Sequence, residues 1–264
     1  MPEHFEDPGY LEDDEAFHHL YSEMESKFPL PIRLDTDRFH DVHALHRLLL
    51  GNMPRKDGLA FCEIGCAPGQ WLVYFNQYFK YRVFGMDRSA DGVRLAKANL
   101  ASLDIPGEVI CADAFTMPFG ENRFDVVFSH SLIEHFNNPD AVFELHDKMT
   151  RPGGTIYIGM PNIRYVNRLV FRLGDFLFGK FRRLGHVHNF ETADLSVFRN
   201  AAEKWGWDIA FLDYVGFFIP QLFTPPQPKK YAKSDVYKTG FLVGRKMPKS
   251  RFLAPTICLI ARKK

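Results

Sequence analysis

The sequence predicts an α/β fold in which helices cover both sides of a mostly parallel sheet of seven strands. Short apolar runs of strand length alternate with longer segments whose apolar residues recur at helical spacing, from about residue 58 to residue 215. The first apolar run ends in a glycine-containing turn that leads directly into a helix. That order is typical of a doubly wound sheet, where ligands bind at the carboxyl ends of the strands.

A helical extension is expected before the sheet. Residues 1–26 carry nine acidic side chains and no Lys or Arg, which indicates a weakly structured acidic arm with a short helix at residues 15–26. Residues 38–50 then place four apolar side chains at helical spacing. Gly51 is expected to end that helix.

The strands and helices of the sheet are expected to alternate in chain order. Asn138 and Pro139 are typical of the N-cap and the first residue of a helix. The sequence Arg151–Gly154 (RPGG) is expected to separate that helix from the next strand. The expected strands are 59–64, 82–86, 108–111, 124–129, 155–160, 207–215 and 256–262, and the expected helices are 70–79, 90–100, 138–149 and 191–205.

Four regions follow from this order. Residues 1–57 form the acidic arm and helices, and residues 58–161 form the first part of the sheet. Residues 162–189 interrupt the alternation and are interpreted as a lid insertion. Residues 190–264 complete the sheet and contain a second insertion at 216–254 before the last strand. Long connections in α/β domains are usually functional or disordered.

Composition excludes several classes of protein. The net charge of +1 argues against a nucleic-acid-binding protein. The four cysteines form no pair or cluster at zinc spacing, so we expect free thiols and no metal site. The N-terminus has no signal-peptide pattern, and no apolar run reaches about 18 residues, so we expect no transmembrane segment and a cytoplasmic protein.

The loop Glu63–Gly69 predicts a site for an anionic or nucleotide-like ligand. Glycines at such a turn let the backbone approach a ligand, and the N-terminus of the following helix offers free N–H groups. A dinucleotide fingerprint would need a small residue at position 70, where this chain has Gln70. The spacing is instead E-x-G-x-A-x-G, with the last glycine at Gly69.

This spacing resembles the first motif of class I S-adenosylmethionine-dependent methyltransferases, (D/E)-x-G-x-G-x-G, with Ala67 in place of the middle glycine. Other segments resemble the family in the same order over roughly residues 58–162. Asp87 ends the second strand, 22 residues after Gly65, and Asp113 follows the third strand. The segments MPF (117–119), NRFDVV (122–127), SHSLIEH (129–135) and RPGG (151–154) continue the likeness.

The resemblance implies a Rossmann-like fold, S-adenosylmethionine as cofactor and S-adenosylhomocysteine as product. In the family, the acidic residue matching Asp87 accepts hydrogen bonds from both ribose hydroxyls, and the one matching Asp113 holds the adenine amino group. The residues it assigns to the cofactor site are Glu63, Gly65, Cys66, Ala67, Gly69, Trp71, Asp87, Arg88, Asp113, Ala114 and Ser129.

Methyl transfer is an in-line displacement, so the protein must align the acceptor and, for a hydroxyl, remove a proton. Histidine suits that proton transfer near neutral pH. His130 and His135 follow the fourth strand, while His186 and His188 precede the helix at 191–205. All four are candidate catalytic residues.

The insertion suggests the acceptor. Residues 162–185 combine large apolar side chains with six basic residues and one acid, and we expect Asn162, Arg164, Arg168 and Asn189 to contact the substrate. This segment is interpreted as a lid, a peripheral membrane contact or a homodimer contact.

The segment Met160–Asn162 (MPN) resembles glycan-related members of the family. It therefore favours O-methylation of a sugar, a nucleotide-sugar or a carrier-linked glycan. The absence of a (D/N)-P-P-(Y/F) motif at Ser129–Leu132 argues against nucleobase N-methylation. Methylation of a carboxylate, phenolic or amine natural product is the alternative, and a catalytically silent S-adenosylmethionine-binding protein is a third hypothesis.

Overall fold

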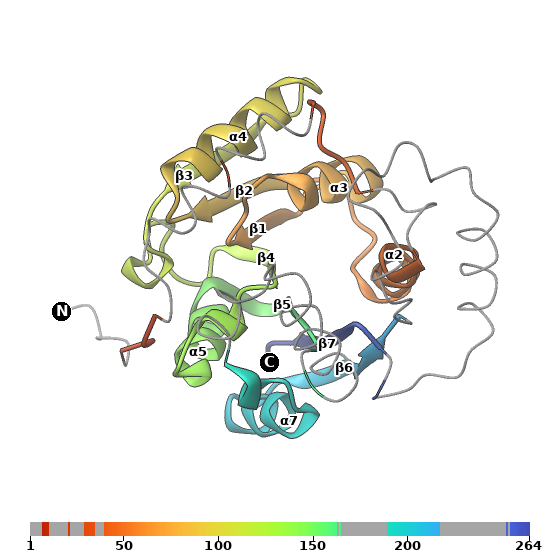
Figure 1. Cartoon of the computed structure of the whole chain (residues 1–264), viewed down its shortest axis with the longest axis vertical. Coiled ribbons are helices and arrows are strands. Elements are labelled where there is room, and N and C mark those ends of the chain that lie inside the picture. Colours follow the sequence, from red (N-terminus) through yellow and green to blue (C-terminus); the bar gives the residue numbers. More distant parts are fainter. Residues whose placement is uncertain are drawn as a thin grey trace, which may run out of the picture.

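Seven strands form one sheet in the computed structural model, in the order β3-β2-β1-β4-β5-β7-β6 (Figure 1). Strands β1 to β5 pair in parallel, and β7 runs antiparallel between β5 and β6. The mostly parallel seven-stranded sheet predicted from the sequence is therefore confirmed. The structure describes residues 7–10, 21, 29–34, 40–162, 164, 189–216, 252 and 254–264.

The elements lie close to where the sequence places them. The helix α3 and the last strand have the predicted bounds, and the other strands differ by one to five residues at an end. The strands are β1 (Ala60–Ile64), β2 (Arg82–Asp87), β3 (Gly107–Cys111), β4 (Phe124–His130), β5 (Thr150–Pro161), β6 (Asp208–Val215) and β7 (Thr256–Arg262). The helices are α2 (His40–Asn52), α3 (Gln70–Phe79), α4 (Ala90–Ala101), α5 (Pro139–Met149) and α7 (Leu195–Lys204).

Two helix boundaries differ from the prediction for identifiable reasons. Gly51 does not end α2, because the helical hydrogen bonds continue to the Met53 N–H, which donates to the Leu49 carbonyl at 2.9 Å. Pro54 follows and cannot continue the pattern, since it has no N–H. The helix predicted at 191–205 is divided into a 3₁₀ helix (Phe190–Thr192) and α7. Asp194 separates them by capping α7: its side chain accepts from the Ser196 N–H at 2.9 Å.

Asn138 occupies the predicted N-cap position of α5, but its side chain makes no capping hydrogen bond. Its amide Nδ2 donates instead to the backbone carbonyl of Asp7 at 3.3 Å. The segment Arg151–Gly154 (RPGG) was expected to lie between α5 and the next strand. It lies within β5 instead, because β5 begins at Thr150, which pairs with Phe124. The pairing register then shifts before Val126, so the glycines lie in an irregular part of β5.

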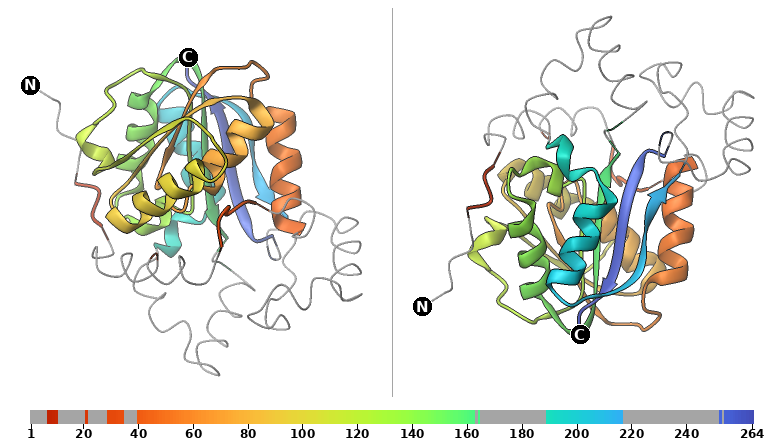
Figure 2. Two further views of the ribbon diagram at one scale, coloured as in Figure 1. Left: turned by 90° about the horizontal axis from the view of Figure 1, so that it is seen from above. Right: turned by 90° about the horizontal axis from the view of Figure 1, so that it is seen from below.

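Helices cover both faces of the sheet. Figures 1 and 2 show α2, α3 and α4 on one face and α5 and α7 on the other. Side chains of the central strands alternate between these layers. Phe61 and Phe128 pack with α3, whereas Cys62 and Val127 belong to the clusters on the other side. All five residues of β1 are buried, as expected for the central strand of a parallel sheet.

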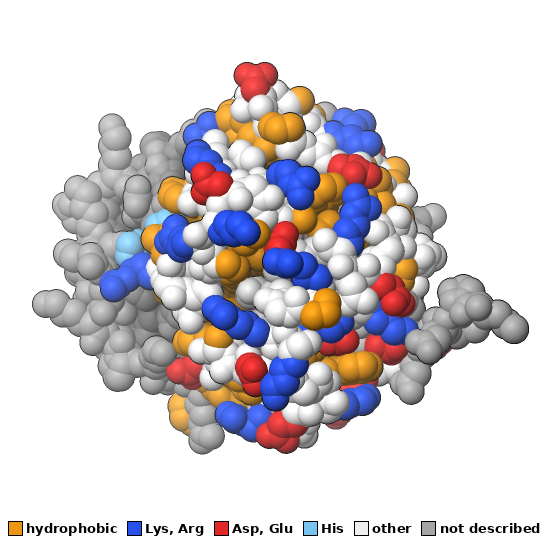
Figure 3. Space-filling view, turned by 180° about the vertical axis from the view of Figure 1, so that it is seen from behind, with side chains coloured by type: hydrophobic (Ala, Val, Ile, Leu, Met, Phe, Trp, Pro, Cys, Tyr) orange, Lys and Arg blue, Asp and Glu red, His pale blue; other side chains and the backbone are white. Residues whose placement is uncertain are grey.

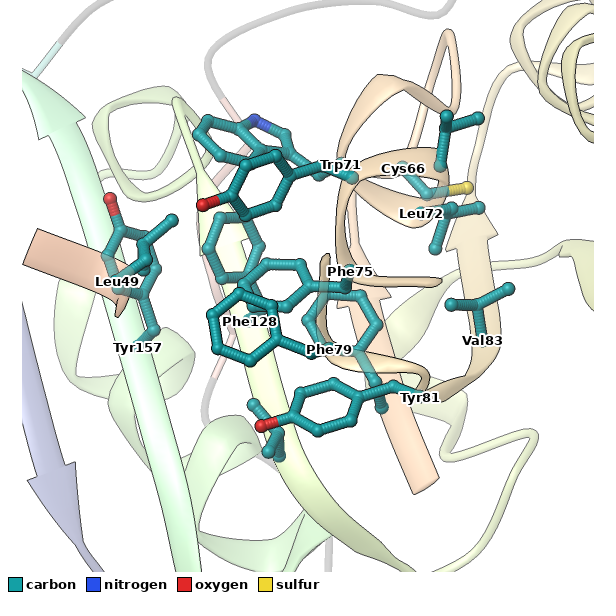
Figure 4. Packing of buried hydrophobic residues seen from close by; sticks show 14 of the residues in the cluster. Leu49, Cys66, Trp71, Leu72, Phe75, Phe79, Tyr81, Val83, Phe128 and Tyr157 are labelled. Atoms are coloured by element: carbon teal, nitrogen blue, oxygen red, sulfur yellow. The ribbon is translucent and has the colours of Figure 1, made fainter. Parts of the chain in front are cut away.

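Aromatic rings fill the layer between α3 and the sheet (Figure 4). The rings of Phe61 and Phe75 stack with centroids 4.2 Å apart, and those of Phe128 and Tyr157 stack at the same separation. The hydroxyl of Tyr81 donates to the Pro54 carbonyl at 2.6 Å, so this buried phenol is satisfied. The aromatic layer therefore provides a rigid support beneath the carboxyl ends of β1 and β4.

Acidic and basic side chains are interspersed on the face drawn in Figure 3. Within the described part of the chain, no helix is long and apolar enough to cross a membrane.

Candidate functional site

A pocket lies at the carboxyl ends of β1 to β4. Its empty volume is about 880 Å³, with the open solvent at the mouth included. Strand ends supply the polar part of the wall, and apolar side chains supply most of the rest. The lining includes Gly65 after β1, Asp87 and Arg88 at the end of β2, Ala112 and Ala114 after β3, and Ser131, Leu132 and His135 after β4.

Two glycines give the loop between β1 and α3 its shape. Gly65 has a φ of +72°, and a Cβ at this position would lie 3.1 Å from the Leu132 Cδ1 atom. Gly69 has a φ of +87°, and a Cβ there would lie 3.1 Å from the Ala96 Cα atom on α4. Both positions combine a left-handed backbone with a close neighbour. The loop can therefore hold its main chain against the pocket while α3 begins immediately behind it.

The carboxylate of Asp87 is fixed at the pocket wall by two backbone groups. Its Oδ2 accepts from the Ala67 N–H at 3.1 Å, and its Oδ1 accepts from the Ser89 N–H at 2.9 Å. Burial raises the pKa of Asp87, while these backbone bonds and the neighbouring Arg88 act in the opposite direction. Each carboxylate oxygen can accept a further hydrogen bond, so Asp87 can receive two ligand hydroxyls.

A second carboxyl group is buried under the loop. Glu63 is 2% exposed, and its Oε2 atom has no hydrogen-bond partner among the residues that the structure describes. Burial, reinforced by the charge of Asp87, raises the pKa of Glu63, and a backbone hydrogen bond from Leu72 opposes that shift. A buried polar atom without a partner is costly, so this oxygen is suited to a donor group on a bound ligand.

Asp113 follows β3 and is held by two donors. The hydroxyl of Tyr10 donates to its Oδ1 atom at 2.7 Å, and the Phe115 N–H donates to the same atom at 3.0 Å. Ala112 and Ala114, on either side of Asp113, line the pocket. Tyr10 lines it too, from a short bridge that the N-terminal segment forms with Phe136.

Of the eleven residues that the resemblance assigns to the cofactor, four line the pocket: Gly65, Asp87, Arg88 and Ala114. The other seven are not part of its lining: Glu63, Cys66, Ala67, Gly69, Trp71, Asp113 and Ser129. Three of these seven have side chains that belong to the core. Cys66 is buried, and burial raises the pKa of its thiol. Trp71 packs its ring 5.1 Å from that of Phe128. The hydroxyl of Ser129 donates to the Nε2 atom of the buried His146 at 3.0 Å. These side chains support the strand ends from within the core.

The structure separates the histidines. His135 lines the pocket, with its Nε2 atom 4.0 Å from Glu134 Oε1. His130 does not line it: its Nδ1 atom is 3.0 Å from the Tyr157 hydroxyl, and its ring lies beside Trp71. Burial lowers the pKa of His130 to about 4. His186 and His188 lie outside the described residues.

The expected substrate residues that the structure describes all have partners within the chain. The Asn162 amide donates to the Ala254 carbonyl at 2.8 Å, and Arg164 forms an ion pair with Asp194. Asn189 accepts from the Glu191 N–H at 3.1 Å, while its own N–H donates to the Glu134 carbonyl at 2.6 Å. Asn189 thus joins the segment before α7 to the 3₁₀ helix Ile133–His135 that carries His135. Arg168 lies outside the described residues.

Sequence reasoning did not find several residues of the wall. Tyr10 and Tyr21 come from the acidic N-terminal arm, and Phe115 and Phe136 come from the segments after β3 and β4. The only local signal was the abundance of aromatic residues, since none of these four belongs to a motif. Within the same described part of the chain, no group of three or more His, Cys, Asp or Glu could hold a metal ion.

Comparison with protein families identifies the central part of the chain. Residues 62–158 match the family model described as "Methyltransferase domain". This range runs from β1 into β5 and contains Gly65, Asp87, Asp113 and His135. The match therefore covers the strand ends that form the pocket.

Curated relatives match over less than half of this chain. Phosphoethanolamine N-methyltransferase 1 of Arabidopsis thaliana is 30% identical over 106 residues, which are 40% of this chain and 22% of that protein. Ubiquinone biosynthesis O-methyltransferase of Brucella ovis is 34% identical over 114 residues, or 42% of this chain and 45% of that protein. The matches span less than half the length of these relatives.

Solved structures resemble the whole chain in fold. The [4+2]-cyclase SpnF has a TM-score of 0.63 at 16% identity, with 99% of both chains covered. An S-adenosylmethionine-dependent methyltransferase from Aquifex aeolicus has a TM-score of 0.56 at 13% identity, covering 92% of this chain and 98% of that one. At these identities the likeness concerns the fold.

Proposed function

We propose that this chain is a class I S-adenosylmethionine-dependent methyltransferase that acts on a small molecule, on the premise that its residues 62–158 match the methyltransferase-domain model. The observation that carries the proposal is the pocket at the ends of β1 to β4. Its wall combines the backbone of a left-handed glycine, Gly65, with the fixed carboxylate of Asp87. A ribose-containing ligand needs both features: a close backbone and an acceptor for two hydroxyls.

The residues present fit S-adenosylmethionine. Asp87 would accept the ribose hydroxyls, and Asp113 would accept the adenine amino group beside the apolar wall. The partnerless Oε2 of Glu63, below the loop, suits the cationic amino group of the methionine part, directly or through water. These three carboxylates lie at the ends of three neighbouring strands, β1, β2 and β3.

When bound, the cofactor supplies a methyl group on a positively charged sulfur, which is already a good leaving group. The chain then has two tasks. The loop Glu63–Gly69 and the segment Ser131–His135 would hold the donor and the acceptor in line, and the apolar wall would exclude water. A hydroxyl acceptor also needs a group that removes its proton.

We propose His135 for that proton transfer. It lines the pocket directly after β4, whereas His130 lies outside the pocket against Tyr157. A pKa of about 4 also makes His130 a weak base at neutral pH. His135 would therefore be the catalytic residue, and His130 a structural residue at the end of β4.

For the acceptor we propose a hydroxyl of a sugar, a nucleotide-sugar or a carrier-linked glycan. Support comes from the MPN segment at Met160–Asn162 and from the basic residues that follow it in sequence. The side chain of Arg164 is 31% exposed and forms an ion pair with Asp194. Because a partly exposed ion pair is weak, Arg164 can exchange Asp194 for an anionic acceptor at a small cost in free energy. A phosphorylated amine is the second candidate, favoured by the 30% identity to phosphoethanolamine N-methyltransferase 1.

A transfer experiment tests the activity and the acceptor together. The whole chain is incubated with S-adenosylmethionine carrying a deuterated methyl group and with separate pools of sugars, nucleotide-sugars, phenols and phosphorylated amines. Mass spectrometry is expected to find a labelled methyl ether in a sugar-containing pool. A labelled amine would contradict the glycan proposal but keep the methyltransferase. The chain could also bind S-adenosylhomocysteine yet label neither the four pools nor a complex metabolite extract. That result would support a catalytically silent binding protein instead.

A further inference from the structure

We propose that Tyr10, on the N-terminal segment, is a positioning residue that gives the pocket its selectivity for adenine by orienting Asp113. The inference rests on the proposed use of S-adenosylmethionine. Tyr10 is 103 residues away from Asp113 in sequence, yet its hydroxyl lies 2.7 Å from the Asp113 Oδ1 atom. No motif of the cofactor-binding region includes it.

The two oxygens of Asp113 are unequal. Oδ1 receives both the Tyr10 hydroxyl and the Phe115 N–H, whereas Oδ2 has no hydrogen-bond partner in the part of the chain that is described. Two donors on one oxygen fix the rotation of the carboxylate. The Oδ2 atom then has a fixed position and can accept a further hydrogen bond. An acceptor there suits the amino group of adenine and repels the carbonyl oxygen of hypoxanthine.

The surroundings of Tyr10 keep it in this position. The guanidinium of Arg88 lies 3.9 Å from the centre of its ring, and the ring of Phe136 lies 5.0 Å away at a tilt. The backbone just before Tyr10 is also tied down, because the Asn137 N–H donates to the Gly9 carbonyl at 2.8 Å. Burial and the bond to Asp113 raise the pKa of Tyr10, so its hydroxyl remains a donor at neutral pH.

Arg88 links this contact to the ribose end of the pocket. It follows Asp87, the residue proposed to hold the ribose, and its guanidinium covers the ring of Tyr10. Tyr21, from the same N-terminal arm, also lines the pocket and packs against α4, since a Cβ on Gly92 would lie 3.1 Å from its ring. Two tyrosines of the arm thus contribute to the cofactor wall.

The test compares two ligands that differ only in the base. S-adenosylhomocysteine and S-inosylhomocysteine are titrated calorimetrically into the whole chain, the Tyr10→Phe variant and the Asp113→Asn variant. The unmodified chain is expected to prefer the adenosyl ligand. Tyr10→Phe is expected to reduce that preference by about 3- to 10-fold, because an Asp113 carboxylate that can rotate keeps only part of its hydrogen bond to the adenine amino group. Asp113→Asn is expected to reduce it further.

Tyr78→Phe is the matched control, because Tyr78 lies on α3 with its ring against His46 and is not part of the pocket lining. It should leave both affinities unchanged. A Tyr10→Phe variant that weakens both ligands equally, or neither, overturns the positioning role and leaves the methyltransferase proposal intact. A chain that binds both bases equally well also overturns it. An unmodified chain that binds neither ligand overturns the proposed function itself, and with it the role of Tyr10.

Discussion

At the scale of single residues, the surroundings of a side chain decide its role more than its place in a motif. His130 is the last residue of β4, and His135 lies five residues further along the chain. His130 is held against Tyr157 in an aromatic layer, where burial lowers its pKa to about 4. His135 lies on the pocket wall beside Glu134. We therefore expect His135 to take part in catalysis and His130 to serve the packing of the core.

The substitution His135→Gln tests this difference. Glutamine keeps a polar side chain of similar size but cannot take a proton, so the rate of methyl transfer to a hydroxyl acceptor should fall by about 10²- to 10⁴-fold. The affinity for S-adenosylhomocysteine should change little. His130→Gln is the control, and its rate is expected to remain within a few-fold of the original. Rates are measured by labelled-methyl incorporation, and an unimpaired His135→Gln variant would rule out His135 as the base.

At the scale of elements, a buried polar link ties the end of β4 to α5. The Nδ1 atom of His146 lies 2.7 Å from the Val142 carbonyl, which can only accept, so Nδ1 carries the proton. The Nε2 atom therefore accepts the Ser129 hydroxyl at 3.0 Å. This network requires a neutral imidazole, and burial lowers the pKa of His146 to about 4.

The link makes the stability of the fold depend on pH. The pKa of His146 is lower in the folded chain than the ordinary value of 6.5, so the unfolded chain binds the proton more tightly. The contribution of neutral His146 to the free energy of unfolding is therefore complete above pH 6.5, and it is lost as the pH falls towards 4. Between pH 7.5 and pH 5, this group should remove about 2 kcal/mol from the free energy of unfolding.

Urea denaturation at several pH values measures the effect. The difference in free energy of unfolding between the original chain and His146→Gln should shrink by that amount as the pH is lowered from 7.5 to 5. A difference that stays constant over this range would show that His146 is not held neutral in the folded state.

The turn between β1 and α3 makes a second prediction at this scale. Gly69→Ala would force a Cβ into a left-handed residue 3.1 Å from the Ala96 backbone, whereas Gly120→Ala has a similar φ of +80° and no neighbour within 4 Å. Gly120→Ala should cost about 1–2 kcal/mol of stability from the backbone conformation alone. Gly69→Ala should cost more, and equal losses in urea denaturation would contradict the close packing of this turn on α4.

At the scale of the whole molecule, the sequence predicts the sheet better than the site. The helix Gln70–Phe79 and the strand Thr256–Arg262 were predicted at their observed bounds, because their apolar patterns and flanking residues are strong local signals. The contact of Tyr10 with Asp113 and the Ser129–His146 link join residues far apart in the chain. Local patterns carry no information about such pairs, so only the folded structure shows them.

The identity of the cofactor is better determined than the identity of the acceptor, because the two depend on different parts of the chain. The residues proposed to hold the cofactor, from Glu63 to Asp113, lie inside the region that matches the methyltransferase-domain model. The residues expected to contact the acceptor lie outside that match, and one of them lies outside the described residues: Asn162, Arg164, Arg168 and Asn189, of which Arg168 is not described. The identity of the acceptor therefore depends on the transfer experiment.

The most direct test of the central claim is a calorimetric titration of the whole chain with S-adenosylhomocysteine, with Asp87→Ala as the comparison. The original chain should bind one ligand per molecule. Asp87→Ala should bind at least about 100-fold more weakly, because two hydrogen bonds from ribose hydroxyls to a carboxylate are lost. A chain that releases no heat and gains no thermal stability from the ligand, or a folded Asp87→Ala variant with unchanged affinity, would contradict the account.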